Sequence, residues 1–231
     1  MPYVRNGGKR VITLSFRRFG NGVYISHTDV LRSLNRTMRR AGIDVNYSKG
    51  FNRHMSLKLS QPLPLGIASD EEWVTADVVS ELDKEEFFRL FSENCPPFIQ
   101  PTAIYVTDKN PSLAAKIIAS DYEIICPEAD GFAEGIEKLK DGFVAVTTKD
   151  GKPAEKDYTG YVRSLEVKNG VIYCRFCFGN KNLRADVFAA VLKEKFNLIV
   201  PLSAITRKRQ LVESGEGLIP AARYMESIAD A

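Results

Sequence analysis

The chain has no run of apolar residues long enough to cross a membrane, and it has few cysteines for its length. Its 231 residues include only 4 cysteines. A membrane span needs roughly 18 or more apolar residues in succession, and four cysteines in a chain of this size do not make a disulfide framework. The polar, basic residues 1–10 also lack the apolar segment of a secretion signal. These absences predict a cytoplasmic protein without membrane contact.

The motifs of the common nucleotide, hydrolase and iron–sulfur chemistries are missing as well. There is no G-x-x-x-x-G-K-[ST] loop, no G-x-G-x-x-G fingerprint and no G-x-S-x-G nucleophile elbow. No cluster of three cysteines is present to hold an iron–sulfur centre. We therefore expect no cofactor and no metal, and neither nucleotide-dependent nor radical chemistry by this chain's own residues.

Positive charge is concentrated in the first quarter of the sequence. Residues 1–60 contain twelve lysines and arginines against two aspartates, an excess of ten positive charges, although the whole chain carries a net charge of only +3. An acidic stretch follows, which contains Asp70, Glu71, Glu72, Asp77, Glu81, Asp83, Glu85 and Glu86. A net charge of +3 does not indicate nucleic acid by itself. Its distribution, however, makes the chain electrically two-sided.

The hydrophobic pattern of residues 1–110 predicts a ferredoxin-like α/β sandwich. Alternation of apolar residues indicates strands, helical spacing indicates helices, and Asp83 with Glu86 resembles a capping box at a helix start. The predicted elements are a strand at 9–19, an extended piece at 23–25, a helix at 28–41, strands at 43–48, 55–60 and 73–79, a helix at 83–95 and a strand at 99–106. Their order is that of an antiparallel sheet with both helices on one face.

Asn110 and Pro111 mark the expected boundary between domains 1–110 and 111–231. The second domain is predicted to contain a helical connector at 112–119, a strand at 122–126, a helix at 132–139, a strand at 143–148, a turn at 149–156, strands at 161–167 and 171–178, a helix at 185–196, a strand at 204–213 and a helical tail at 220–228. Asn169-Gly170 is a strong hairpin signal. These elements predict a second α+β unit of related layout.

The helix at 28–41 has one apolar and one cationic face. Val30, Leu31, Leu34 and Met38 have the spacing of a buried face, and the other face carries Arg32, Arg36, Arg39 and Arg40. Such a row is most often a solvated surface. Here, however, no glutamate lies four residues away from these arginines, and like charges at that spacing repel each other. An anionic partner, either RNA phosphates or an acidic protein surface, would relieve the repulsion.

Both histidines of the protein flank this helix. His27 lies at the helix start, where a capping or packing role competes with a role in acid–base chemistry or phosphate contact. His54 lies in the predicted loop that also contains Gly50, Phe51, Asn52 and Arg53, and loops of this kind often carry function. The sequence leaves open whether the two imidazoles share one surface. Tyr24, Tyr47 and Phe51 are candidates for stacking or for the core.

Cys174 and Cys177 form a C-x-x-C motif that is typical of zinc and redox sites. No second C-x-x-C or neighbouring histidine accompanies it, and the motif lies within a predicted strand, where residues three apart point to opposite faces. We therefore interpret these cysteines as structural.

Four short motifs in succession resemble the bacterial radical SAM-linked protein family. They read S-H-T-D-V-L-R from Ser26, R-T-M-R-R-A-G from Arg36, Y-S-K-G-F-N-R-H-M from Tyr47 and P-L-P-L-G from Pro62. The resemblance is close over roughly the first 80 residues and extends to the rest only in layout. The matching positions are Ser26, His27, Asp29, Arg32, Arg39, Arg40, Ser48, Gly50, Phe51, Asn52 and His54. Arg53 and Met55 depart from the family, which usually has proline at both positions.

The resemblance implies an accessory protein, because members of that family are encoded beside, or fused to, radical S-adenosylmethionine (SAM) enzymes. Combined with the basic helix, it predicts a module that binds RNA or another anionic partner for a radical SAM enzyme. The predicted binding residues are Ser26, His27, Asp29, Arg32, Arg36, Arg39, Arg40, Gly50, Phe51, Asn52, Arg53 and His54. Two alternatives remain open. One is a ribonuclease or RNA-modifying enzyme that uses His27 and His54, and the other is a protein–protein adaptor that binds no RNA.

Overall fold

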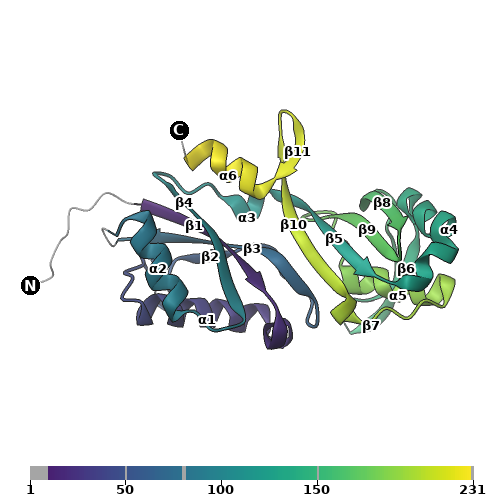
Figure 1. Ribbon diagram of the computed structural model, residues 1–231, viewed down its shortest axis with the longest axis horizontal. Coiled ribbons are helices and arrows are strands. Elements are labelled where there is room, and N and C mark those ends of the chain that lie inside the picture. Colours follow the sequence, from purple (N-terminus) through teal and green to yellow (C-terminus); the bar gives the residue numbers. More distant parts are fainter. Residues whose placement is uncertain (1–9, 50, 80–81, 150, 230–231) are drawn as a thin grey trace, which may run out of the picture. The chain divides into compact units, whose positions relative to one another are not determined.

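The protein has a mixed α+β fold (Figure 1). The contacts between its residues divide it into two compact units. The computed structural model describes residues 10–49, 51–79, 82–149 and 151–229. Unit 1 comprises Met1–Pro62, Glu71–Lys116 and Ala221–Ala231, and unit 2 comprises Leu63–Asp70 and Ile117–Pro220. Each unit is therefore assembled from segments that are separated in the sequence.

Unit 1 has the predicted ferredoxin-like arrangement. Its elements are β1 (Arg10–Arg18), η1 (Gly20–Tyr24), α1 (His27–Arg40), β2 (Leu57–Leu59), β3 (Ala68–Val78), α2 (Lys84–Asn94), β4 (Ile99–Thr107), α3 (Leu113–Lys116) and α6 (Ala221–Ala229). The strand order is β4-β1-β3, with β2 paired to β3 on its other edge. This 4-1-3-2 order with a helix after the first and third strands defines the fold.

The core of unit 1 lies between one face of this sheet and the helices α1 and α2. Strand β1 contributes Ile12, Leu14 and Phe16, which alternate along the strand and are all buried. Helix α1 contributes Val30, Leu34 and Met38, and helix α2 contributes Phe87 and Phe91. Because α1 buries this stripe, its opposite face is left to solvent.

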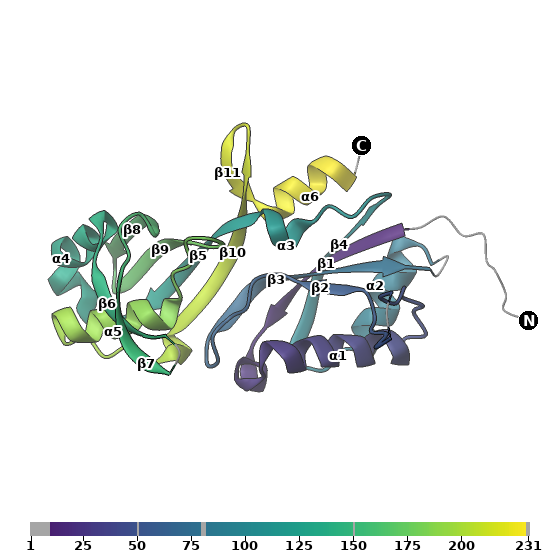
Figure 2. The same cartoon turned by 180° about the vertical axis from the view of Figure 1, so that it is seen from behind.

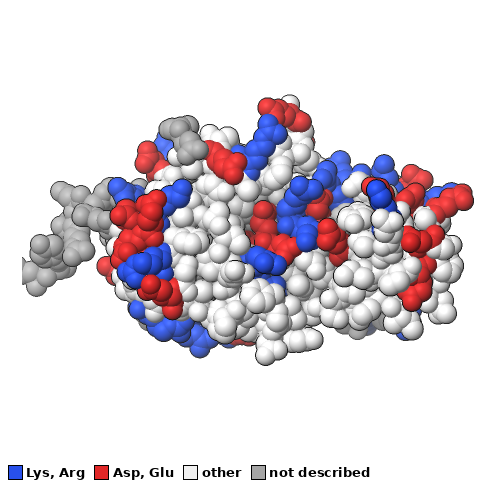
Figure 3. Space-filling view, in the orientation of Figure 1, with Lys and Arg blue, Asp and Glu red and all other residues white. Residues whose placement is uncertain are grey.

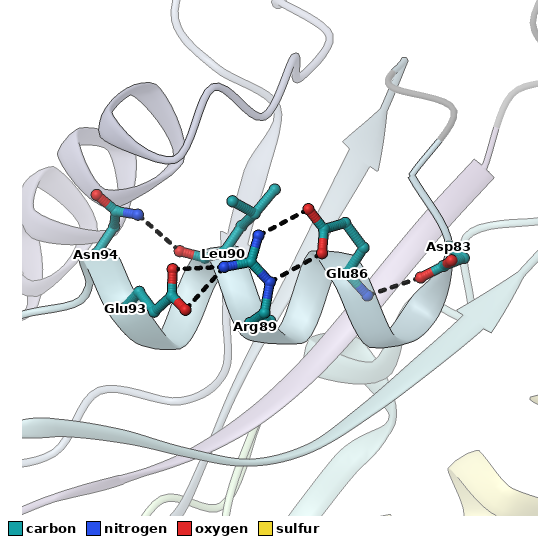
Figure 4. A network of polar contacts seen from close by, with 6 residues as sticks. All are labelled: Asp83, Glu86, Arg89, Leu90, Glu93 and Asn94. Atoms are coloured by element: carbon teal, nitrogen blue, oxygen red, sulfur yellow. Dashed lines mark hydrogen bonds and ion pairs between the residues drawn. The ribbon is translucent and has the colours of Figure 1, made fainter.

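Helix α2 begins at a side-chain cap and carries an ion-pair network on its exposed surface (Figure 4). The side chain of Asp83 accepts a hydrogen bond from the backbone N–H of Glu86 at 2.7 Å, which confirms the predicted helix start. The carboxylate of Glu86 instead binds the guanidinium of Arg89 at 2.9 Å, and Arg89 also binds Glu93 at 2.8 Å. Arg89 thus holds two of the helix's carboxylates within the helix itself.

Unit 2 repeats the layout of unit 1, as the sequence predicts. Its elements are β5 (Ile117–Ile125), η2 (Pro127–Phe132), α4 (Ala133–Glu137), η3 (Lys138–Asp141), β6 (Val144–Lys149), β7 (Lys152–Asp157), β8 (Val162–Lys168), β9 (Val171–Cys177), α5 (Ala185–Phe196), η4 (Leu202–Ala204), β10 (Ile205–Ser214) and β11 (Gly217–Pro220). Four strands form the sheet of this unit in the order β10-β5-β9-β8, and their three pairings are antiparallel. When β5, β8, β9 and β10 are numbered from 1 to 4 along the chain, this order is again 4-1-3-2. The β6-β7 hairpin is an insertion between α4 and β8.

One face of the unit 2 sheet packs against helices. Tyr122, Cys174 and Phe176 from the central strands are buried together with Phe188 and Leu192 from α5. The Asn169-Gly170 turn joins β8 to β9 with φ angles of 54° and 70°, which confirms the predicted hairpin. The opposite face of the same strands carries charged residues, which are described below.

Two local predictions for unit 2 are wrong. Residues 152–157 form strand β7 rather than part of a turn, and they pair with β6. Most side chains of β7 are exposed or half-buried, so the strand lacks the buried alternation by which strands are detected in a sequence. The predicted helical connector also ends early, because β5 begins at Ile117, where two successive isoleucines favour extended backbone.

In unit 1, two predicted extended pieces differ from expectation. Residues 23–25 mostly belong to the 3₁₀ turn η1, which Gly20 begins with a φ of 55°. Residues 43–48 form isolated bridges, Val45 with Val78 and Tyr47 with Met55, rather than a continuous strand. The chain after α1 is therefore tied to the sheet at single points and remains loop-like.

Candidate functional site

Helix α1 is positioned by a cap at its first turn. The hydroxyl of Ser26 accepts a hydrogen bond from the backbone N–H of Asp29 at 3.2 Å and donates one to the Asp29 carboxylate at 2.7 Å. The helix ends at Arg40, and Gly42 follows in the left-handed region with a φ of 67°. Ser26 and Asp29 therefore have a structural role at the helix start.

The arginines on the exposed face of α1 differ in what they contact. Arg32 pairs with Asp29 at 2.8 Å, so an aspartate three residues earlier balances it. The hydrogen bond from Ser26, followed by that from Arg32, lowers the pKa of the Asp29 carboxyl below its ordinary value. Arg40 donates a hydrogen bond to the backbone carbonyl of Asn94, the last residue of α2. These two arginines have structural partners within unit 1.

Arg36 and Arg39 have no such partner among the residues that the structure describes. Both are exposed on the second half of α1. Figure 3 shows lysine and arginine side chains gathered along the lower left of the view, where the C-terminal half of α1 lies. Positive charge in the last turn also complements the helix dipole, which gives Arg39 a modest structural reason to be there. Arg36 lies one turn earlier and gains less from the dipole.

The 48–54 loop is closed at its base by hydrogen bonds between its two ends. The backbone N–H of Ser48 donates to the carbonyl of His54 at 2.8 Å, and the N–H of His54 donates to the Ser48 hydroxyl at 3.1 Å. The same hydroxyl lies 3.0 Å from Nδ1 of the His54 ring. The imidazole of His54 thus helps to close the loop. Of the predicted loop residues, Gly50 lies outside the described residues.

The tip of this loop projects into solvent. Phe51 has a relative exposure of 104%, so none of its ring is buried within the described structure. Lys49, Asn52 and Arg53 are exposed as well, and Tyr47 at the base is also largely exposed. Tyr47 and Phe51 are therefore surface residues and do not belong to the core.

His27 and His54 lie at opposite ends of α1. His27 is the first residue of the helix, whose 14 residues span about 20 Å at the rise of an α-helix. The 48–54 loop extends from the segment that follows the other end, where the N–H of Ile43 bonds to the carbonyl of Met38. Figure 2 shows η1 at one end of α1 and the chain turning back at the other. The fold therefore does not place the two imidazoles where both could act on the same bond of a substrate.

We call the exposed group at the C-terminal end of α1 the basic patch. It consists of the cations Arg36, Arg39, Lys49 and Arg53 and the aromatic residues Tyr47 and Phe51. None of the four cations forms a hydrogen bond or ion pair with another residue in the described ranges, and Asp44 is the exposed carboxylate nearest to them in the sequence. The patch therefore combines exposed cations, which form no hydrogen bond or ion pair in the described ranges, with an open aromatic ring.

The cysteines of the C-x-x-C motif are buried in unit 2. Cys174 and Cys177 are free thiols with relative exposures of 3% and 2%. Burial raises the pKa of the Cys174 thiol well above its ordinary value. In the described ranges, no three His, Cys, Asp or Glu residues are grouped so as to hold a metal ion. The burial of both thiols supports the interpretation that these cysteines are structural.

A second polar cluster lies on the outer face of the unit 2 sheet and has only a weak signal in the sequence. It joins Asp121 of β5, Arg175 of β9 and Arg209 of β10 by ion pairs of 2.6 and 2.7 Å. In the sequence Asp121 and Arg175 are isolated charges within largely apolar strands, and Arg209 ends the run Arg207-Lys208-Arg209. Their proximity depends on the strand order, which spacing along the chain does not reveal.

Fold and surface together define the class, an α+β protein of two ferredoxin-like units whose first unit carries an exposed basic and aromatic patch. Over residues 11–192, the chain matches the family described as "Uncharacterized protein conserved in bacteria (DUF2344)". It belongs to that family, which confirms the expectation of an uncharacterised bacterial family. The chain has no significant match among curated proteins. Within the described residues, no helix is both long enough and apolar enough to cross a bilayer.

Proposed function

We propose that this protein is a binding module that holds single-stranded RNA through the basic patch. The observation that carries the proposal is the solvent-exposed ring of Phe51 together with exposed cations that form no hydrogen bond or ion pair in the described structure. The exposed ring of this phenylalanine adds nothing to the core, and transfer of its apolar surface out of water onto a ligand is favourable. A nucleobase stacked on the ring would cover it, and phosphates would neutralise the arginines and lysine.

RNA accounts for the combination of groups better than an acidic protein surface does. A surface of carboxylates would satisfy the four cations, but it offers no flat ring on which Phe51 and Tyr47 can stack. Single-stranded RNA offers phosphates and stackable bases within one nucleotide, and proteins bind it by this combination. Several of the other predicted residues have roles in the framework of the patch. Ser26 caps the helix, Asp29 pairs with Arg32, and Arg40 joins the helix to α2. His54 closes the loop together with Ser48.

A radical SAM enzyme is the partner that we propose for the module. This part of the proposal is supported by the motifs that resemble the radical SAM-linked family, since the same motifs build α1 and the 48–54 loop. The module would present a bound RNA to the enzyme, whose own cofactors would supply the chemistry. The motifs absent from this sequence are consistent with that division of labour.

The two alternative functions make different demands on the same residues. A ribonuclease that used His27 and His54 as acid and base would need both within reach of one phosphodiester. Their positions at opposite ends of α1 do not favour this function. A protein–protein adaptor would use the same exposed surface without nucleic acid. Retention on an immobilised radical SAM partner after ribonuclease treatment, with no affinity for purified RNA, would support the adaptor.

The experiment that tests the proposal measures RNA affinity over a range of salt concentrations. A labelled RNA of about 12 nucleotides is titrated by fluorescence anisotropy at about 50 to 300 mM KCl. The variant with Arg36→Ala and Arg39→Ala is compared with the parent chain. The control carries Lys193→Ala and Lys195→Ala, which remove two exposed cations from the last turn of α5.

We expect the arginine variant to bind RNA more weakly, with a salt dependence shallower by about 1.4 in log K against log salt, because each phosphate contact contributes about 0.7. The control is expected to match the parent chain. Equal affinities for the two variants, or a binding constant independent of salt in the parent chain, would contradict the proposal.

A further inference from the structure

The outer face of the unit 2 sheet holds a hollow lined by charged side chains. Its volume is about 420 Å³, and its lining includes Asp121, Glu123, Ser164, Tyr173, Arg175 and Arg209. The sheet pairs Asp121 with Arg175, and Glu123 with Tyr173, in register across β5 and β9. Directly paired residues of antiparallel strands point to the same face. The hollow therefore lies on the face opposite the one that packs against the helices.

Asp121 holds two guanidinium groups at one side of this hollow. Arg175 donates to both carboxylate oxygens, from Nε at 2.6 Å and from Nη2 at 3.1 Å. Arg209 donates from Nε to Oδ2 at 2.7 Å. The Asp121 side chain is only 15% exposed, so these bonds are largely shielded from water. Two cations share one anion, and this side of the hollow carries one unbalanced positive charge.

Both guanidinium groups retain further N–H donors. A guanidinium has five donors in a rigid plane, whereas the bonds to Asp121 use two from Arg175 and one from Arg209. The Arg209 side chain is 53% exposed, and the remaining N–H groups of both residues form no hydrogen bond that involves another described residue. Asp121 thus fixes the orientation of two forks whose other edges are open to an anion.

The other side of the hollow is formed around the ammonium group of Lys208. Lys208 lies 2.5 Å from Asp70 and 3.4 Å from Glu123, and the hydrogen bond to Asp70 raises the pKa of the lysine. Two carboxylates therefore lie within ion-pair distance of one ammonium here. Figure 3 shows positive and negative side chains beside each other over β5 and β10. The hollow thus has two guanidinium groups around one carboxylate at one side, and two carboxylates around one ammonium at the other.

We propose that this hollow binds a small molecule through a phosphate or carboxylate group held by Arg175 and Arg209. The hydroxyls of Ser164 and Tyr173 line the same space and can donate to such an anion. Glu123 lies two residues from Asp121 on β5, about 7 Å along the strand, and accepts a hydrogen bond from a donor at the other end of the ligand. A volume of 420 Å³ fits a ligand of metabolite size.

This site is separate in function from the basic patch and does not depend on RNA binding. All of its residues belong to unit 2, whereas the basic patch belongs to unit 1. Failure of one proposal therefore leaves the other unaffected. The ligand class is set by the donors: phosphate and carboxylate both match a guanidinium fork, and only measurement with each distinguishes them.

Calorimetric titration of the full chain with inorganic phosphate, and separately with succinate, tests the proposal. Arg209→Ala removes one of the two forks from an exposed position. Arg184→Ala is the matched control, because Arg184 is similarly exposed in unit 2 and pairs with Asp186 at 2.6 Å. We expect one of the two anions to bind with one-to-one stoichiometry, and Arg209→Ala to weaken it about tenfold or more, as the loss of charge-assisted hydrogen bonds implies. The control is expected to bind like the parent chain.

A second measurement on the parent chain keeps the test independent of folding defects. In a ¹⁵N spectrum of the arginine side chains, the anion should shift the Nε–H signals of Arg175 and Arg209 and leave that of Arg184 in place. Absence of binding by both anions would overturn the proposal. So would equal weakening in the Arg209 and Arg184 variants, or equal shifts of all arginine signals, because each would indicate nonspecific attraction to positive charge.

Discussion

Replacement of Phe51 by alanine separates a role in binding from a role in folding. The ring is fully exposed, so its removal uncovers no core surface and creates no cavity. Substitutions at such positions typically change the free energy of unfolding by less than about 0.5 kcal/mol. The urea midpoint of Phe51→Ala should therefore equal that of the parent chain.

The same substitution should weaken RNA binding substantially. Loss of one base stacked on an aromatic ring costs about 1–3 kcal/mol, which corresponds to an increase in Kd of about fivefold to over a hundredfold. Phe51→Tyr retains a stacking surface and should bind RNA like the parent chain. The assay is fluorescence anisotropy with the single-stranded RNA described above, at one fixed salt concentration.

Tyr24 supplies the matched control for this prediction. It is a largely exposed aromatic residue, at 68%, and it precedes the N-terminal end of α1, away from the basic patch. Tyr24→Ala should leave RNA affinity unchanged. The reasoning is refuted if Phe51→Ala binds RNA as tightly as the parent chain, or if it loses no more affinity than Tyr24→Ala.

Three further predictions concern the framework around the proposed sites. Asp121→Ala should lower the free energy of unfolding by about 2 kcal/mol in urea titration, because it leaves the partly buried Arg175 without its charge-assisted bonds; a loss below about 0.5 kcal/mol would count against the network. Ser26→Ala should raise the depressed pKa of Asp29 toward its ordinary value, and an unchanged NMR titration of Asp29 would contradict the cap. In the parent chain, the stabilisation linked to the depressed pKa is present at pH values above the ordinary pKa. It is lost as the pH falls through the pKa of the folded state. Cys174 should resist iodoacetamide in the native protein and react after unfolding, whereas rapid native labelling would contradict its burial.

The sequence predicts the ferredoxin-like layouts because burial leaves periodic traces along the chain. Ile12, Leu14 and Phe16 alternate as a half-buried strand does, and the Asn169-Gly170 pair favours the positive φ angles of the hairpin turn. Strand β7 escapes prediction because its pairing with β6 buries little, so backbone hydrogen bonds form without an apolar pattern. The assignment of residues 63–70 to unit 2 and 221–231 to unit 1 likewise depends on tertiary contacts.

The candidate site is predicted from the sequence in its composition but not in its geometry. The count of charges identifies the cationic helix face, and the residue types between two predicted strands identify the 48–54 loop. Spacing alone does not show that Arg32 and Arg40 have partners while Arg36 and Arg39 have none in the described structure, because the partners depend on rotamers and on the neighbouring helix. Spacing along the sequence also does not show that His27 and His54 lie at opposite ends of α1, because their positions depend on the path of the chain after the helix.

Ultraviolet crosslinking of the full chain to single-stranded RNA, followed by mass spectrometry of the crosslinked residues, tests the central claim most directly. Aromatic residues that stack on a base are well placed to react with it, so the account predicts crosslinks at Phe51 or Tyr47, which compete away with unlabelled RNA. Crosslinks confined to other parts of the chain, or none above background at a salt concentration where RNA binds, would contradict it.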